Sequence, residues 1–440
     1  MVIINKFFIA FLCLIFCNVS SQIISMSFPK FAGQTYMFLL FQGNQTIKQE
    51  GIIPASGDFN LTIPKGLIPY TGMARWLLTN SKDGGGLDMI INAQDFSITC
   101  NEPLPNNSNI IYKGPSQTPQ LNRLNKEQAS ILNRYAAMQM AVQSFTPNHA
   151  QYKMFQQELN EQQHSYRNFH EKASASGQYD QIFLMITNIT RGLGPELTED
   201  PKIKANMIAM YIANDLDWNI LYTSGHWSTV IDMWTNAHAT VIQQPERFIA
   251  DFVKIGNQLN NKRMYADWAA QVSRSLSQAG KDMLISAVAP YVTGSGKILN
   301  YEDDLAAYTK GNPGTLAPDL YFGKDILKAT ELSKDDYKKT LLLFYDSECG
   351  HCERVLHQIP LLYSNFKDKK VRIVSISEDR DEEVYKSKLQ NFLWKDHYHD
   401  TGSINSRNYG IGGMPTLVLI DNQGKILLKT ASIEEVMIKI

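Results

Sequence analysis

The chain has 440 residues, enough for two or three domains. Its 42 Lys and Arg residues nearly balance its 43 Asp and Glu residues, and the net charge is −1. This balance gives no electrostatic case for nucleic acid binding, so we exclude a nucleic acid partner.

The first 21 residues have the pattern of a secretory signal peptide. Lys6 is the basic start, Phe7–Cys17 is an apolar core, and Val19 and Ser21 suit cleavage before residue 22. The core is shorter than the roughly 20 residues of a membrane helix, and no later stretch is apolar enough to span. We therefore expect an exported protein with no membrane span in the mature chain. Lipid anchoring at Cys17 is the less favoured alternative.

Residues 22–113 are predicted to form an all-β, sandwich-like domain, because short β-prone runs alternate with turn clusters. Cys100, at the end of this pattern, is expected to be a buried free thiol or a strand residue. The runs are Tyr36–Phe41, Thr46–Ile53, Asp58–Ile63, Arg75–Leu78, Leu87–Asn92 and Asp95–Thr99.

Gly114–Pro119 has the composition of a linker, and residues 118–310 then form a predicted α-helical region. No catalytic signature occurs in it, so we expect it to influence which proteins reach the last domain. Its four tryptophans, at positions 218, 227, 234 and 268, are expected in its core. The expected helices are Leu121–Val142, Tyr152–Ala173, Gln178–Arg191, Ile203–Asn214, Thr229–His238, Glu246–Leu259, Met264–Ser277 and Lys281–Val292.

Residues 314–440 follow a break at Gly311–Gly314 and alternate between strand and helix patterns, which indicates an α/β fold. The whole chain is thus predicted to be multidomain. The expected strands are Leu341–Tyr345, Lys370–Ile376, Thr416–Ile420 and Lys425–Lys429, and the expected helices follow Cys349 and cover Asp381–Trp394 and Ile433–Ile440.

Cys349 and Cys352 are two thiols at the junction between an apolar strand and a helix. A cysteine at a helix start gains from the free N–H groups and the helix dipole, which stabilise a nucleophilic thiolate. Gly350 and His351, between the cysteines, are expected to tune that thiolate. Cys352, one turn later and more buried, would resolve a mixed disulfide.

A zinc site and a structural disulfide are the alternatives for this pair. Zinc would need four ligands, and the chain has no second pair of cysteines at this spacing. His357, His397 and His399 would complete such a site only by accident of folding. We therefore predict no metal and no bound cofactor.

With these motifs in this order, residues 314–440 resemble the thioredoxin superfamily, and more closely the TlpA-like thiol-disulfide oxidoreductases of the bacterial cell envelope, often labelled AhpC/TSA. The matching motifs are Ala317-Pro318-Asp319, Cys349-Gly350-His351-Cys352, Val374–Ser377, Tyr409-Gly410-Ile411, Met414-Pro415-Thr416 and Leu419–Lys425. Residues 22–113 resemble the small β-domain of unassigned function that precedes many such domains.

The resemblance implies a thioredoxin fold, a periplasmic or cell-envelope location, and a cis-proline at Pro415 that faces the cysteines. Met414 and Thr416 would then hold the substrate backbone beside Pro415. Two positions depart from the family. Leu343 replaces the buried acid that relays protons to the second cysteine, so that role has no assigned residue, and Glu348 replaces a tryptophan before the first cysteine.

The function predicted from these motifs is that of an exported enzyme, a thiol-disulfide oxidoreductase with a redox-active centre. Its partners would be cysteine-containing envelope proteins and a membrane thiol reductant or oxidase. A thiol peroxidase of the AhpC/TSA type is disfavoured, because Phe344 or Tyr345 and Asp346 occupy the positions of that family's Pro and Thr or Ser. The third alternative is a non-enzymatic envelope binding protein with a structural disulfide.

Overall fold

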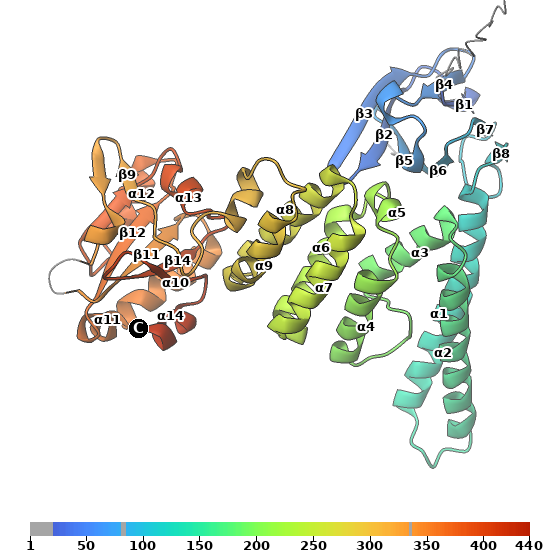
Figure 1. Cartoon of the computed structure of the whole chain (residues 1–440). Helices are drawn as coiled ribbons and strands as arrows, with labels where there is room; N and C mark the ends of the chain where they lie inside the picture. Colours follow the sequence, from blue (N-terminus) through green and yellow to red (C-terminus); the bar gives the residue numbers. More distant parts are fainter. Residues whose placement is uncertain (1–20, 81–84, 334–336) are drawn as a thin grey trace, which may run out of the picture. The chain divides into compact units, whose positions relative to one another are not determined.

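A computed structural model describes residues 21–80, 85–333 and 337–440. The predicted signal peptide core and Cys17 lie outside these residues. The chain divides into two compact units (Figure 1). One comprises the residues up to Leu40 together with Thr46–Arg123, and the other comprises Phe41–Gln45 and Leu124–Ile440. Within the described ranges, no helix has the length and apolar character needed to cross a membrane.

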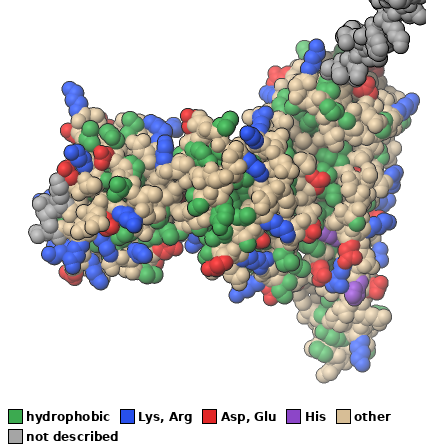
Figure 2. All heavy atoms as spheres, in the orientation of Figure 1, with side chains coloured by type: hydrophobic (Ala, Val, Ile, Leu, Met, Phe, Trp, Pro, Cys, Tyr) green, Lys and Arg blue, Asp and Glu red, His purple; other side chains and the backbone are tan. Residues whose placement is uncertain are grey.

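Charged side chains of both signs are mixed on the face of the protein that Figure 2 shows. On the face drawn in Figure 2, Lys and Arg side chains lie interspersed with Asp and Glu side chains. This mixture agrees with the near balance of basic and acidic residues in the sequence.

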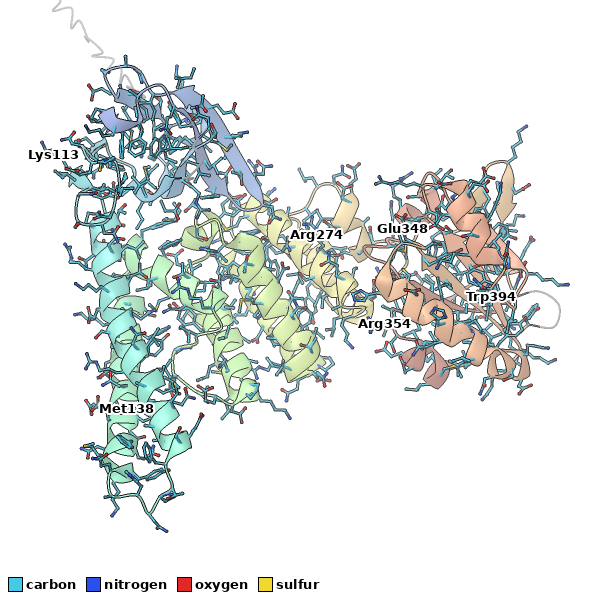
Figure 3. The ribbon with its side chains drawn as sticks, turned by 180° about the vertical axis from the view of Figure 1, so that it is seen from behind. Lys113, Met138, Arg274, Glu348, Arg354 and Trp394 are labelled. Atoms are coloured by element: carbon cyan, nitrogen blue, oxygen red, sulfur yellow. The ribbon has the colours of Figure 1, made fainter. Side chains whose placement is uncertain are left out.

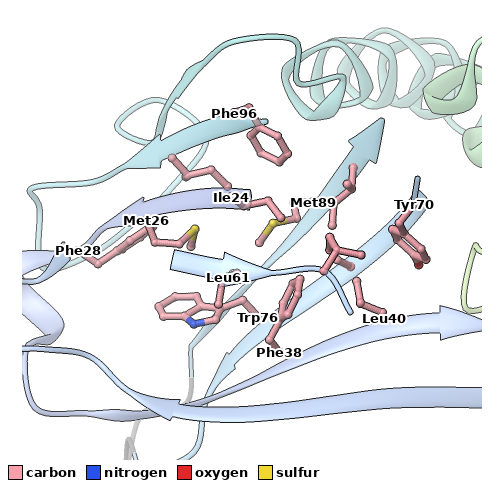
Figure 4. Close-up of a cluster of buried hydrophobic side chains, with 14 of the residues drawn as sticks. Ile24, Met26, Phe28, Phe38, Leu40, Leu61, Tyr70, Trp76, Met89 and Phe96 are labelled. Atoms are coloured by element: carbon pink, nitrogen blue, oxygen red, sulfur yellow. The ribbon is translucent and has the colours of Figure 1, made fainter. Parts of the chain in front are cut away.

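The first unit consists of two four-stranded sheets around one core. The first sheet has the order β4-β1-β7-β8 and the second has the order β3-β2-β5-β6. The core between them is built from large apolar side chains such as Phe38 and Trp76, which are at most 3% exposed (Figure 4). The strands are β1 (Ile23–Ser27), β2 (Thr35–Gln42), β3 (Gln45–Ile52), β4 (Asp58–Thr62), β5 (Thr71–Leu78), β6 (Gly86–Asn92), β7 (Phe96–Thr99) and β8 (Ile111–Lys113).

All six predicted strands are present in this unit, and the structure adds β1 and β8. β1 lies in the middle of its sheet, parallel to β7 and antiparallel to β4. Cys100 directly follows β7, is 1% exposed and is a free thiol, as expected.

Each predicted helix of the helical region is present in the structure, with its ends shifted by a few residues. The linker prediction was too long, because α1 begins at Thr118 and includes Pro119, a residue that the first turn of a helix tolerates. The four tryptophans are at most 4% exposed, as expected for core residues. The helices are α1 (Thr118–Ser144), α2 (Tyr152–Ser174), α3 (Tyr179–Thr190), α4 (Pro201–Asn214), α5 (Trp218–Tyr222), α6 (Trp227–Asn236), α7 (Pro245–Gln258), α8 (Lys262–Gln278) and α9 (Asp282–Gly294), with a π-helical turn at Ala237–Ile242 and a 3-10 helix at Asp303–Tyr308.

The C-terminal region contains a five-stranded mixed sheet with the order β13-β12-β11-β14-β15 and a separate two-stranded antiparallel sheet of β9 and β10. Strands β11, β12 and β13 are parallel, whereas β14 and β15 are antiparallel to their neighbours. Both faces of the sheet are covered by apolar clusters. The elements are β9 (Leu320–Phe322), β10 (Asp325–Leu327), β11 (Lys339–Tyr345), α10 (Gly350–Leu361), α11 (Tyr363–Asp368), β12 (Val371–Ser377), α12 (Glu382–Leu389), β13 (Asp396–His399), α13 (Ile404–Asn408), β14 (Thr416–Asp421), β15 (Ile426–Thr430) and α14 (Ile433–Lys439).

One expectation for this region was wrong. The helix predicted over Asp381–Trp394 ends at Leu389, and the edge strand β13 follows it. The strand was missed because all four of its residues, Asp-His-Tyr-His, are only half-buried and show no apolar alternation.

Candidate functional site

The site lies where β11 ends and α10 begins. Thr340 to Tyr345 are completely buried, so the central strand fixes the start of the loop that follows. Asp346 then shapes that loop, because its carboxylate accepts the N–H of Glu348 at 2.8 Å and its carbonyl accepts the N–H of Cys349 at 3.2 Å. Cys349 is the N-cap residue of α10.

The two cysteines differ in environment. Cys349 is partly exposed, whereas Cys352 is 0% exposed and packs with Val355 and Ile359 on the buried stripe of α10. Burial raises the pKa of the Cys352 thiol, and the neighbouring thiol of Cys349 raises it further. Cys349 is therefore the cysteine that a second protein can reach.

The Met414–Pro415 loop lies against Cys349. The Met414–Pro415 peptide bond is cis. The Cys349 thiol lies 3.6 Å from the carbonyl oxygen of Met414 and donates to it. Thr416 pairs with Phe344 in the β14–β11 ladder, which places Pro415 beside the end of β11. The backbone of Met414 is thus adjacent to the reactive sulfur.

Thr416 has a structural contact in addition to its predicted role at the substrate. Its side chain is 3% exposed, and its hydroxyl donates to the carbonyl of Gly413 at 2.7 Å. This hydrogen bond closes the turn that contains Met414 and Pro415.

The residues around the cysteines are exposed. Glu348 and His351 are both exposed, and His351 lines a groove beside Pro415. Gly350 opens α10, and a Cβ built there would meet no atom within 4 Å. Glu348 and Arg354 lie at the side of the domain from which α10 starts (Figure 3).

Asp379, which was not predicted from the sequence, accepts hydrogen bonds from the loop that precedes Cys349. Its carboxylate accepts the backbone N–H and the hydroxyl of Ser347 at 2.6 and 2.7 Å, and the hydroxyl of Ser377 at 2.6 Å. The residue is 3% exposed. Because β11 and β12 are parallel and Tyr345 pairs with Ser377, the loops after both strands meet at one edge. An acid two residues after the second buried strand was the signal available in the sequence.

Glu378 is a second acid at this edge, and it too was missed. Burial raises the pKa of its carboxyl group, and the charges of Asp400 and Asp346 raise it further. Leu343, at the family's proton-relay position, is completely buried in β11.

The histidines weighed as zinc ligands have other partners. The Nδ1 atom of His397 lies 2.9 Å from the Ser375 hydroxyl, and the Nε2–H of His399 donates to the carbonyl of Asp379 at 2.6 Å. His357 lies 3.7 Å from Glu353 on the exposed face of α10. Across the residues that the structure describes, no group of three or more His, Cys, Asp or Glu side chains is arranged to hold a metal ion.

Comparisons with known proteins find relatives of part of this chain. Thiol-disulfide oxidoreductase ResA of Bacillus cereus is 28% identical over 130 residues, which cover 29% of this chain and 75% of that protein. ResA of Bacillus anthracis is 28% identical over 128 residues, 29% of this chain and 74% of that protein.

Two solved structures are also similar to parts of the chain. The thioredoxin domain of a thiol-disulfide oxidoreductase from Bacteroides vulgatus is 24% identical and covers 27% of this chain and 86% of its own, with a TM-score of 0.24. A thioredoxin-like protein from Bacteroides caccae is 16% identical and covers 55% of this chain and 95% of its own, with a TM-score of 0.35. The family model for thioredoxin-like proteins matches residues 336–426, and the C-terminal region of this multidomain chain is therefore a thioredoxin-like domain.

Proposed function

We propose that the chain is a thiol-disulfide oxidoreductase that exchanges disulfides with cysteine-containing proteins through Cys349 and Cys352. The observation that carries the proposal is the pairing of a reachable thiol at a helix N-terminus with a buried thiol one turn away. The named activity of the ResA relatives supports it.

In the reducing direction, the Cys349 thiolate attacks one sulfur of a substrate disulfide. The substrate S–S bond breaks, one substrate sulfur leaves as a thiolate, and a mixed disulfide forms. Cys352 then loses its proton and attacks Cys349, which releases the second substrate thiolate. The protein gives up two electrons and becomes the disulfide, while the substrate becomes a dithiol. The oxidising direction is the reverse, and neither direction requires a bound cofactor.

The neighbouring residues have supporting roles in this proposal. Met414 presents its carbonyl beside Cys349, so a substrate backbone can pair with the loop that contains Pro415. Asp379 holds the loop before Cys349. Gly350 and His351 tune the thiolate of Cys349. The Thr416 hydroxyl fixes the loop of Met414 and Pro415 through its hydrogen bond to the carbonyl of Gly413.

We further propose that the chain is exported through residues 1–21 and works in the periplasm or cell envelope. There it would exchange electrons with a membrane thiol reductant or oxidase. We also propose that the mature chain has three domains, at residues 22–113, 118–310 and 314–440. Sequencing the N-terminus of the secreted protein tests the cleavage before Gln22.

Cysteine variants test the exchange directly. Cys352→Ala should accumulate mixed disulfides with cysteine-containing proteins, because the bond to Cys349 is no longer resolved. Cys349→Ala should trap none. Cys100→Ala is the matched control, because Cys100 is a buried thiol of the first unit, and this variant should exchange disulfides as the unaltered protein does. Trapping by neither active-site variant would overturn the proposal, and turnover of hydrogen peroxide would replace it with a peroxidase.

A further inference from the structure

A groove beside the redox centre is lined jointly by the thioredoxin-like domain and the helical region, both within the second unit. Its volume is about 350 Å³. One wall is the turn between α8 and α9, residues 277–281, which we call the α8–α9 wall. α10 lines the groove with His351, Arg354 and Gln358. Met414, Pro415 and residues 431–434 complete the lining. The helical region thus forms part of the surface that a substrate at Cys349 meets.

The α8–α9 wall is firmly attached to the thioredoxin-like domain. Lys429 of β15 and Asp282 of α9 form a buried ion pair at 3.3 Å, with 2% and 4% of their side chains exposed. The same ammonium group donates to the carbonyls of Tyr409 and Gly410, in the segment that leads to Met414. One lysine therefore connects the helical region to the loop of Pro415.

Glycines bring the two backbones into close contact at this place. A Cβ at Gly280 would lie 2.5 Å from Ala431, and one at Gly412 would lie 2.8 Å from the hydroxyl of Ser277. Larger residues at either position would push the wall away from the groove. The wall is thus a fixed surface rather than a loosely attached neighbour.

The charges that face the groove favour an anionic ligand. Arg354 is exposed, and its side chain has no ion-pair or hydrogen-bond partner among the residues that the structure describes. Lys281 forms an ion pair at 3.8 Å with Glu435, a residue that does not line the groove. His351 also lines the groove and is exposed. The acid of the lining, Glu434, keeps its negative charge, because hydrogen bonds from Ser432 and Gln358 help to lower its pKa. The cations Arg354 and Lys281 outnumber this acid in the lining, and Arg354 is the one without an ion-pair partner among the described residues, so it is the cation available to a carboxylate of a substrate.

We propose that this groove selects an extended cysteine-containing peptide segment with a carboxylate next to its cysteine, which Arg354 binds while the α8–α9 wall confines the segment. The inference rests on the proposed function, since it names the substrate class of the same site. Extended segments fit because the groove follows α10 from His351 to Gln358 and is also lined by Met414, whose carbonyl oxygen lies 3.6 Å from the Cys349 sulfur.

The test uses two disulfide-linked peptide dimers that differ only in having Asp or Lys beside the cysteine. The unaltered chain should reduce the Asp peptide about two- to five-fold faster, which is the range of one exposed charge pair. Arg354→Gln should bring the rate ratio close to one, and so should Gln278→Glu, which places a negative charge on the α8–α9 wall. Lys369→Gln is the matched control, because this exposed lysine follows α11 at the amino end of β12, the opposite edge of the sheet.

Reduction of hydroxyethyl disulfide, which is small and neutral, separates the two levels of the proposal. Equal rates for both peptides, with hydroxyethyl disulfide still reduced, would overturn the inference and leave the oxidoreductase function standing. Failure both to reduce any of the three disulfides and to oxidise the corresponding thiols would overturn the function itself. A ratio that Lys369→Gln lowers as much as Arg354→Gln would also contradict the inference.

Discussion

The Sγ atom of Cys349 lies 3.6 Å from the carbonyl oxygen of Met414, whereas the thiol of Cys352 is completely buried on the inner face of α10. We predict that iodoacetamide modifies one cysteine of the reduced native protein rapidly, namely Cys349. Cys352 and Cys100 should react at least about ten-fold more slowly, since burial blocks access and raises the pKa of the Cys352 thiol. Mass spectrometry of timed samples measures this, and equal labelling of both active-site cysteines would refute it.

Asp379 is predicted to position the cysteine loop. Asp379→Asn removes the charge from three hydrogen bonds and should lower the free energy of unfolding by about 2 kcal/mol. It should also slow disulfide exchange, because Ser347 no longer holds the residues before Cys349. Denaturant unfolding and the peptide assay measure both effects.

Asp381→Asn is the control for Asp379→Asn. Asp381 is exposed and caps α12 through the N–H of Glu383, and asparagine caps a helix about as well as aspartate. Equal stability and equal exchange rates in the two variants would show that Asp379 does not hold the loop.

The buried ion pair between Lys429 and Asp282 predicts a strong effect of a single substitution. Lys429→Met leaves the carboxylate of Asp282 buried without its cation, which should cost about 3 to 5 kcal/mol of unfolding free energy at pH 7. Lys281→Met removes the exposed pair with Glu435 and should cost less than about 1 kcal/mol. Similar losses in the two variants would contradict the assignment.

The same variant has a predicted pH dependence. Burial raises the pKa of Asp282 in the folded protein, and Lys429 opposes that rise. Without Lys429 the folded-state pKa rises further, so the folded protein keeps a proton that the unfolded chain releases as pH increases. Stability linked to this group is present in acid and is lost as pH rises through the folded pKa. The deficit of Lys429→Met should therefore be smaller at pH 4 than at pH 7, and a constant deficit would disprove this.

His170 predicts acid sensitivity of the helical region. Burial among Tyr166, Tyr211 and Ser174 lowers the pKa of this histidine from 6.5 to about 4. The unfolded chain then binds the proton first as pH falls, so this contribution of about 3 kcal/mol is present above pH 6.5 and is lost toward pH 4. Unfolding curves of His170→Gln between these pH values should lack that loss. An unchanged pH slope would show that His170 does not cause it.

The sequence predicted the parts of the site that lie in one continuous stretch. An apolar strand followed by Cys349 and Cys352 has a local pattern, and the buried strand and the N-cap position follow from it. Asp379 escaped prediction because Ser347, its partner in the cysteine loop, is brought to it only by the pairing of β11 with β12. The α8–α9 wall escaped for the same reason, since nothing near Gln278 in the sequence indicates its place beside Pro415.

The most direct test of the account is the redox equilibrium of Cys349 and Cys352 with glutathione, read by thiol alkylation. We predict one reversible two-electron transition between about −270 and −120 mV, the range from thioredoxin to the strongest oxidants, with the fold retained in both states. A value near −270 mV would indicate a reductase, and one above about −180 mV an isomerase or oxidase. No disulfide at any glutathione ratio, or a disulfide below about −300 mV as in structural bridges, would contradict the proposed function.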